Sequence, residues 1–193
     1  MLFHIFSFII AISSSRLGGW QTVPVDHSAI QAQSEYLKRN IPHLFPELEN
    51  GLYEIASAKI QVVKGLNIQL IIKGTSTRLL VEMTLHIDLD QKTTISRIKR
   101  AMGSKPILGG WRWQNPKQFT ASQLANTMEL ILKKANILMK TGSGEVLVYR
   151  TKMEDGIKTH VVFEDAHHNL FSAITTKDPQ SKAEDLVKVY QIF

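Results

Sequence analysis

The segment Leu17-Gly18-Gly19-Trp20 decides how this chain is divided, because it recurs as Leu108-Gly109-Gly110-Trp111 at an offset of 91 residues. The same offset carries Lys64-Gly65-Leu66-Asn67 onto Asp155-Gly156-Ile157-Lys158 without a gap. Self-similarity at a fixed spacing indicates duplicated structural units. The sequence therefore predicts two similar modules, at 16–100 and 108–193, joined by a short linker at 101–107.

Each module is expected to contain one helix followed by antiparallel strands. Apolar residues at helical spacing predict helices over 29–44, with a cap from Asp26-His27-Ser28, and over 123–139. Alternating apolar and polar residues predict strands at 52–63, 66–72, 78–90, 145–152, 157–163, 169–176 and 184–192. An antiparallel sheet with a helix against its apolar face is an α+β fold. We expect each module to build a core of its own.

Composition excludes several classes of protein. Hydrophobic residues make up 44% of the chain and charged residues 21%, as in ordinary globular proteins and unlike disordered or collagen-like chains. The chain has no cysteine, which excludes disulfide scaffolds, thiolate zinc sites and cysteine nucleophiles. The net charge of +6 is divided evenly between the halves, without a basic arm, so we expect no nucleic-acid partner.

No pattern in the sequence is typical of an enzyme. Phosphate-binding loops, serine elbows and paired-carboxylate motifs are absent, so we expect neither catalytic activity nor a cofactor. His86-x-Asp88-x-Asp90 and His167-His168 could be metal ligands or solvated strand and turn residues, and we expect no metal site. The tryptophans 20, 111 and 113 could be stacking platforms, although covering a sheet or helix is the more ordinary role for them.

The N-terminus has the pattern of a secretory signal peptide. Residues 1–15 form a short apolar run followed by small residues, with Ala11-Ile12-Ser13 as a small-x-small cleavage site. We expect a mature protein that begins near 14–16, has no membrane segment, and resides outside the cell or in the lumen of endomembranes or lysosomes. A hydrophobic strand or anchor is the alternative for residues 1–15, and their retention would favour the cytoplasm.

Module one resembles the cystatin family. The resemblance rests on Leu17-Gly18-Gly19, a helix after it, and a hairpin whose turn reads Gln61-Val62-Val63-Lys64-Gly65. The stretch Ser57-Ala58-Lys59-Ile60 before the hairpin is also similar to a cystatin strand. Through the 91-residue repeat the resemblance extends to module two. It implies that each module is an antiparallel sheet wrapped around one helix, and that the protein reversibly inhibits papain-like cysteine proteases of the cathepsin type.

The resemblance also implies which residues bind the protease. They form an apolar wedge beside the enzyme's thiolate and comprise Gly18, Gly19, Gln61, Val62, Val63, Lys64 and Gly65. Gly18 and Gly19 belong to the N-terminal segment that we call the trunk, and the conformational freedom of glycine lets this segment pass close to the enzyme. The two valines offer rigid β-branched surface that loses little entropy on binding.

Several positions depart from the cystatin pattern. Lys64 stands where alanine is common, and the second hairpin, at 88–93, lacks the Pro-Trp pair of many cystatins. Module two replaces the first-loop signature with Lys152-Met153-Glu154-Asp155-Gly156, whose acids are costly to desolvate in a cleft. We therefore expect module two to inhibit poorly or not at all. The alternative function is a non-inhibitory cystatin-like scaffold that binds another protein, and exchange of the first hairpin between molecules could produce dimers.

Overall fold

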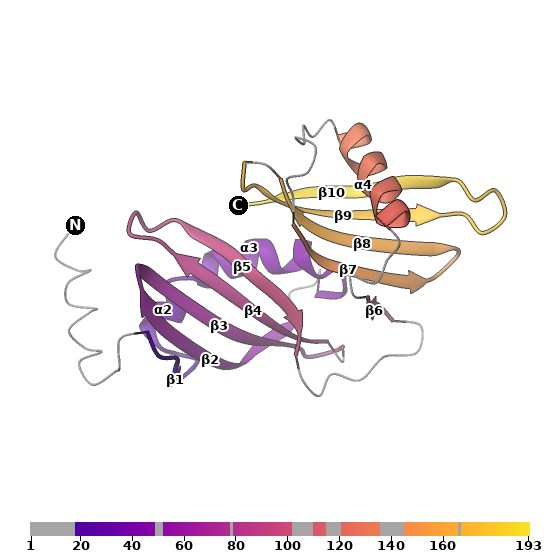
Figure 1. Ribbon diagram of the computed structural model, residues 1–193. Helices are drawn as coiled ribbons and strands as arrows, with labels where there is room; N and C mark the ends of the chain where they lie inside the picture. Colours follow the sequence, from indigo (N-terminus) through magenta and orange to yellow (C-terminus); the bar gives the residue numbers. More distant parts are fainter. Residues whose placement is uncertain are drawn as a thin grey trace.

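The computed structural model describes residues 18–48, 52–77, 79–101, 110–114, 121–135, 145–165 and 167–193. They form two five-stranded antiparallel sheets, each associated with helices (Figure 1), so the predicted α+β class is confirmed. We call 18–101 module one and 110–193 module two. The predicted signal peptide and the linker, apart from Ala101, lie outside the described residues. None of the described helices is long and apolar enough to span a membrane.

The first sheet has the order β1-β2-β3-β4-β5. Its strands are β1 Gln21–Val23, β2 Tyr53–Val63, β3 Gly65–Gly74, β4 Leu80–Ile87 and β5 Thr93–Arg100. On β3 and β4, apolar residues alternate with polar ones, which leaves one face buried and one face open to solvent. Strand β5 was not predicted from the sequence, because a bulge opposite Thr84 and Leu85 interrupts its alternation and most of its residues are polar.

The helix predicted over 29–44 is two helices, α2 Ser28–Gln31 and α3 Ser34–Leu44, followed by the 3₁₀ turn η1 Pro46–Leu48. His27 caps α2, its Nδ1 accepting from the Ala29 amide at 3.2 Å. The break falls at Gln33, whose side-chain oxygen accepts a hydrogen bond of 2.8 Å from the Thr93 hydroxyl on β5. This bond ties the break to the beginning of β5.

The second sheet has the order β10-β9-β8-β7-β6. Its strands are β6 Arg112–Trp113, β7 Val146–Met153, β8 Ile157–Glu164, β9 Leu170–Lys177 and β10 Glu184–Ile192. Helix α4, Ala121–Ala135, lies across this sheet (Figure 1), with Ile131 buried against it and Met128 and Leu132 packed around it. The last residues of the helix predicted over 123–139 lie outside the described residues.

The duplication extends to the strand register. The pair Gln21↔Ile60 in the first sheet reappears as Arg112↔Thr151 in the second, which is the same offset of 91 at both positions. A bulge between Ile55 and Ser57 likewise reappears between Val146 and Val148. Insertions or deletions would have shifted these pairs, so the first halves of the two modules correspond residue by residue.

The expectation that each module has a core of its own is wrong. The core between the first sheet and its helices continues into module two through Val148, Val162, Leu170 and Ile192. The other face of the second sheet packs a smaller cluster, including Tyr149, Val161 and Phe163, against α4. Two neighbouring strands of this sheet are therefore buried on both faces in their middle segments. One reason lies in the sequence: the buried Val148 stands where module one has the exposed Ser57.

Candidate functional site

The predicted site residues of module one meet at one end of the first sheet, next to the N-terminal trunk (Figure 1). Gly18, Gly19 and Trp20 lead into β1, which pairs with β2 just before the β2–β3 turn. In that turn Val63 pairs with Gly65 across Lys64. The turn between β4 and β5 lies beside it, because Leu66 pairs with Ile87. The sequence predicted these residues to lie together, and the geometry brings the trunk and two hairpin tips to one edge.

Gly65 is required at its position. Its φ is +109°, and a Cβ atom built there would lie 2.3 Å from the Ile87 carbonyl oxygen. Both facts exclude a side chain. The close approach of this glycine to β4 is what places the β2–β3 tip against the β4–β5 turn.

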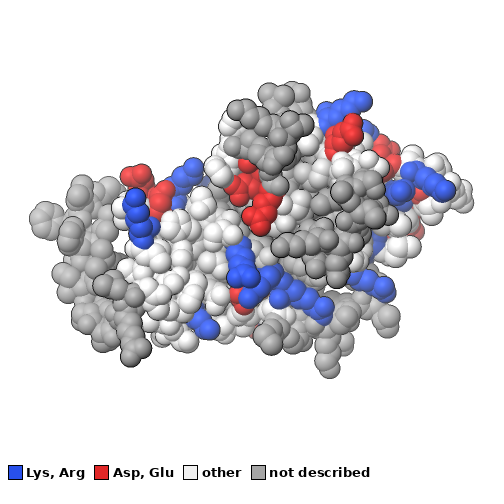
Figure 2. Space-filling view, in the orientation of Figure 1, with Lys and Arg blue, Asp and Glu red and all other residues white. Residues whose placement is uncertain are grey.

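The β4–β5 turn is held by Asp88. One carboxylate oxygen of this residue accepts hydrogen bonds from the amides of Asp90 and Lys92, each 2.9 Å long. The alternation of the predicted strand 78–90 puts Leu89 on the same face as the buried Leu85 and Ile87, but the turn begins at Asp88 and the Leu89 side chain is 65% exposed. Acidic and basic side chains lie next to each other over this turn (Figure 2). Leu89 was therefore missed as a surface residue, and the Asp88-x-Asp90 spacing was the available signal for a turn.

Three apolar side chains are exposed at this end, one from each piece. Trp20 in the trunk is 42% exposed, Val63 at the first tip is 39% exposed, and Leu89 at the second tip is exposed as described. Val62 is half-buried, and Lys64 is exposed. We call Trp20, Val63 and Leu89 the apolar tip. Large apolar side chains gathered at one exposed edge are typical of a binding surface.

A chain of amide and imidazole groups crosses the open face just behind the apolar tip. His86 Nδ1 lies 2.7 Å from Asn67 Oδ1, Asn67 Nδ2 donates to Gln61 Oε1 at 2.9 Å, and Gln61 Nε2 donates to the Gly18 carbonyl at 2.8 Å. We call these four residues the amide ladder. The ladder links β4, β3 and β2 to the trunk. From the sequence, Asn67 received no role and His86 was considered only as a candidate metal ligand or a solvated strand residue, although Gln61 and Asn67 flank the predicted turn symmetrically.

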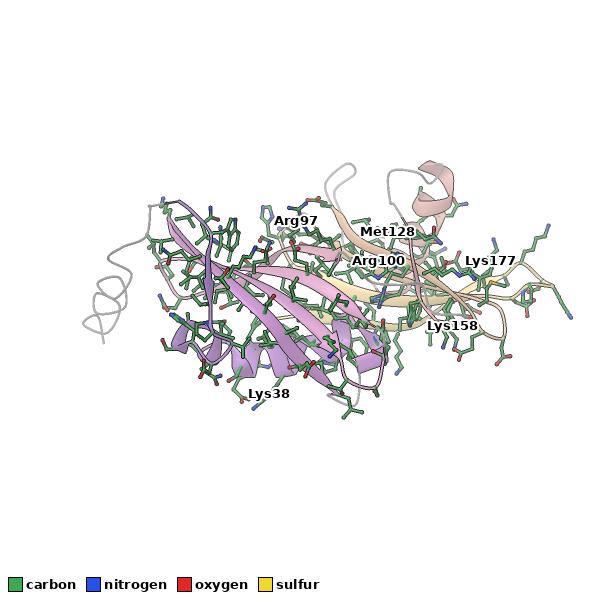
Figure 3. The ribbon with its side chains drawn as sticks, turned by 90° about the horizontal axis from the view of Figure 1, so that it is seen from below. Lys38, Arg97, Arg100, Met128, Lys158 and Lys177 are labelled. Carbon is green, nitrogen blue, oxygen red and sulfur yellow. The ribbon has the colours of Figure 1, made fainter. Side chains whose placement is uncertain are left out.

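The corresponding tip of module two has different chemistry. Met153, 67% exposed, takes the place of Val62, and Glu154 takes the place of Val63. Glu154 forms ion pairs with Lys158 at 2.8 Å and with Lys152 at 2.9 Å. The hydrogen bonds from Lys158 and Lys152 lower the pKa of Glu154 to about 2. This tip therefore carries fixed charges where module one presents an apolar edge. It lies in the half of the molecule away from the trunk, where Figure 3 labels Lys158 and Lys177.

In the described part of the module-two trunk, Gly110 and Trp111 are half-buried, whereas their counterparts Gly19 and Trp20 are exposed. Trp111, the counterpart of Trp20, packs edge-on against His160 with ring centroids 5.7 Å apart. The Arg150 guanidinium lies 5.3 Å from the centre of the Trp111 ring. Trp111 and Trp113 both pack against the buried Arg150 of the second sheet, as the sequence suggested for a sheet-covering role, whereas Trp20 is 42% exposed.

A buried polar cluster joins the two modules. Arg150, fully buried, donates to Glu47 of η1 at 2.6 and 3.2 Å and to His160 Nδ1 at 2.8 and 3.1 Å. Since Nδ1 accepts, the His160 Nε2 proton faces Ser172 Oγ at 2.9 Å, and the Ser172 hydroxyl donates to the His43 carbonyl at 2.7 Å. We call these five residues the junction network.

The junction network is structural. Burial, reinforced by the charge of Arg150, holds the pKa of His160 well below its usual range. Burial also lowers the pKa of Arg150, and the Glu47 carboxylate opposes that effect. A neutral histidine beside a serine has the composition of a nucleophilic pair. Both side chains are buried, however, and the hydroxyl proton is engaged with a main-chain carbonyl.

Within the described ranges, no group of three or more His, Asp and Glu side chains could hold a metal ion. His86 instead belongs to the amide ladder, and the Asp88 carboxylate holds its own turn. Comparison of the sequence with known protein families finds no match, and comparison with curated proteins finds none.

Proposed function

We propose that this protein is a reversible inhibitor of papain-like cysteine proteases, acting mainly through module one. The observation that carries the proposal is the convergence of the trunk and two hairpin tips into one edge with three exposed apolar side chains. An edge of this kind can enter a narrow cleft as a wedge. Its side chains are displayed on turns and a trunk, so the cleft is filled without a scissile carbonyl beside the thiolate.

Under this cystatin-like proposal, the trunk and each of the two hairpin tips have a separate role. Gly18 and Gly19 pass close to the enzyme, while Val62 and Val63 fill the cleft with little loss of side-chain entropy. Leu89 supplies the third contact in place of the Pro-Trp pair that the second hairpin lacks. Gln61 and Gly65 hold the first tip in position, and Lys64 lies at its surface.

Module two contributes little to inhibition under this proposal. Insertion of its tip would require desolvation of Glu154 and of its two lysine partners, and buried charges are costly. Its trunk is held in the junction through Trp111. Module two therefore acts chiefly as a support for module one. The same features favour the second candidate function, a non-inhibitory scaffold whose partner is another protein.

Matched substitutions in the full chain test the proposal, since the shared core makes isolated modules unsuitable. Val63→Asp places an unpaired carboxylate in the wedge, and we expect inhibition of a papain-type protease to weaken at least a hundredfold, about 2.7 kcal/mol. Met153→Asp changes the exposed tip of module two and should leave inhibition unchanged. If the wild-type chain does not inhibit, or if both variants inhibit equally well, the proposal fails and the scaffold function is favoured.

The location and assembly of the protein follow from the same proposal. A secreted or lysosomal inhibitor would meet cathepsin-type proteases where they act, and this requires removal of residues 1–15. N-terminal sequencing of the exported protein decides the point, with a start near 14–16 expected. Exchange of the β2–β3 hairpin between two molecules would bury the tip and reduce inhibition, which size-exclusion chromatography of active and inactive fractions would reveal.

A further inference from the structure

The trunk of module one has few neighbours to hold it. Gly18 has a φ of +86°, and a Cβ atom built there would have no other atom within 4 Å. Gly18, Gly19 and Trp20 are all exposed. Trp20 precedes Gln21, the first residue of β1 to pair with β2, and the hydrogen bond from Gln61 Nε2 holds the Gly18 carbonyl beyond that pairing. The position of Gly18 therefore depends on the direction in which the Gln61 amide points.

The amide ladder fixes that direction. Gln61 must present its nitrogen to Gly18, so its oxygen faces β3 and needs a donor. Asn67 supplies the donor, which turns its own oxygen toward β4. His86 Nδ1, at 2.7 Å, completes the ladder as a donor. Every group in the ladder thus has one role, and reversing any amide would place two donors or two acceptors face to face.

Module two supports a specific role for the ladder. Lys152 and Lys158 stand at the positions of Gln61 and Asn67, and Thr176 stands opposite Lys158 as His86 stands opposite Asn67. Both lysines bind Glu154 instead of the trunk. The ladder thus occurs in the module whose trunk lies open, and it is replaced in the module whose trunk is packed into the junction.

We propose that Asn67 and His86 are positioning residues that act through Gln61 to hold the trunk in the apolar tip. The expected effect on inhibition rests on the proposed function, whereas the expected effect on the mobility of the trunk does not. Restricting a binding segment before association reduces the entropy lost on binding. Loss of the ladder should weaken inhibition by about tenfold, the effect of one net hydrogen bond.

The first experiment tests the ladder without a protease. In the full chain, Asn67→Leu removes both amide contacts with little change in volume, and ¹⁵N relaxation reports the mobility of Gly18, Gly19 and Trp20. We expect these amides to become more mobile. The control is Gln69→Leu, which removes a 2.8 Å bond to Glu82 on the same face and leaves the ladder intact. Unchanged mobility in Asn67→Leu, or an equal increase in the control, would overturn the proposal.

The second experiment measures inhibition by a double-mutant cycle. If Asn67 acts through Gln61, Asn67→Leu weakens inhibition in the wild-type background and has no further effect in a Gln61→Ala background. His86→Gln, which retains a donor, should preserve most of the inhibition that His86→Leu loses. Additive effects of Asn67→Leu and Gln61→Ala would contradict the proposal. A wild-type chain without inhibitory activity would defeat the proposed function alone, since the relaxation experiment would still decide the role of the ladder.

Discussion

The open face of the first sheet and the corresponding face of the second sheet use the same positions for different purposes. In module one these positions hold a polar row on the open face, in which the two lysines are exposed and the two middle residues are half-buried: Lys59, Gln69, Glu82 and Lys99. In module two the corresponding row is Arg150, His160, Ser172 and Tyr190, and it contacts module one through Glu47 and His43. Figure 3 shows Lys38 of α3 and Arg97 of β5 on opposite sides of the first sheet, one face being covered by the helices and the other open.

The difference shows how a duplicated module can become a support. In the first sheet Gln69 donates to Glu82 at 2.8 Å, and in the second His160 and Ser172 form the same diagonal contact at 2.9 Å. The geometry of the row is retained while its charges are reduced. A face that repeated Lys59, Glu82 and Lys99 could not have been buried without heavy desolvation costs. The exchange of these residues joins the two modules into one folding unit.

The largest expected effect comes from breaking the junction. Glu47→Ala leaves the buried Arg150 charge without its carboxylate, which should lower the free energy of unfolding by about 3–5 kcal/mol. Glu54→Ala is the control, because Glu54 and Lys73 of the first sheet form an ion pair of 2.7 Å whose side chains are both about half exposed, and it should contribute less than about 1 kcal/mol. Urea denaturation followed by tryptophan fluorescence measures both. Equal losses in the two variants would show that burial does not distinguish the two ion pairs.

The next largest effect is expected from substitution of the glycines in the two hairpin turns. A Cβ atom on Gly65 would lie 2.3 Å from the Ile87 carbonyl, and one on Gly156 would lie 2.6 Å from the Lys177 carbonyl. Alanine at either position should cost about 1–3 kcal/mol of stability, since both have positive φ. Only Gly65→Ala should also weaken inhibition of a papain-type protease. Equal loss of inhibition in the two variants would show that the turn of module two also contacts the enzyme.

A third comparison concerns pH. His160 stays neutral in the folded protein, whereas a histidine in the unfolded chain is protonated below about pH 6.5. The unfolded state thus binds the extra proton, so stability falls as pH decreases below that value, by about 1.4 kcal/mol per unit from this residue. His160→Gln installs the residue that module one has at Gln69 and should remove that slope. Denaturation at pH 7, 6 and 5 tests this, and parallel profiles for the two proteins would contradict it.

Much of the fold could be predicted because it depends on local patterns. The alternation in 78–90 predicts one face made of Leu79, Val81, Met83, Leu85, Ile87 and Leu89, and all of these except Leu89 are buried. The pattern of β10 gave its bounds, Glu184–Ile192, to the residue. The 91-residue repeat anticipated the shared register of the two sheets. Alternation and spacing reflect which side of a strand meets a core, and this information is written along the chain.

The junction could not be predicted in the same way. Consecutive buried residues such as Val161, Val162 and Phe163 indicate a strand covered on both faces, but they do not tell which element covers the second face. The answer depends on Glu47, which is 103 residues away from Arg150 in the chain. The candidate site lies between these cases: its glycines and valines were visible as a motif, whereas Leu89 became a surface residue only because Asp88 turns the chain.

The smallest expected effect is also the sharpest test of the comparison between the modules. Replacing residues 152–158 with the sequence of 61–67 would give module two the first-loop sequence and both amides of the ladder. We expect no gain of inhibition, because Trp111 remains packed against Arg150 and His160 and no free trunk completes the second tip. The graft is best made in a Val63→Asp background, where any restored inhibition must come from module two. Titration against a papain-type protease should leave that protein inactive, and the graft in the wild-type background should still bind one enzyme molecule. Restored inhibition, or two enzyme molecules bound, would mean that the loop alone determines binding, and the support role assigned to module two would then be wrong.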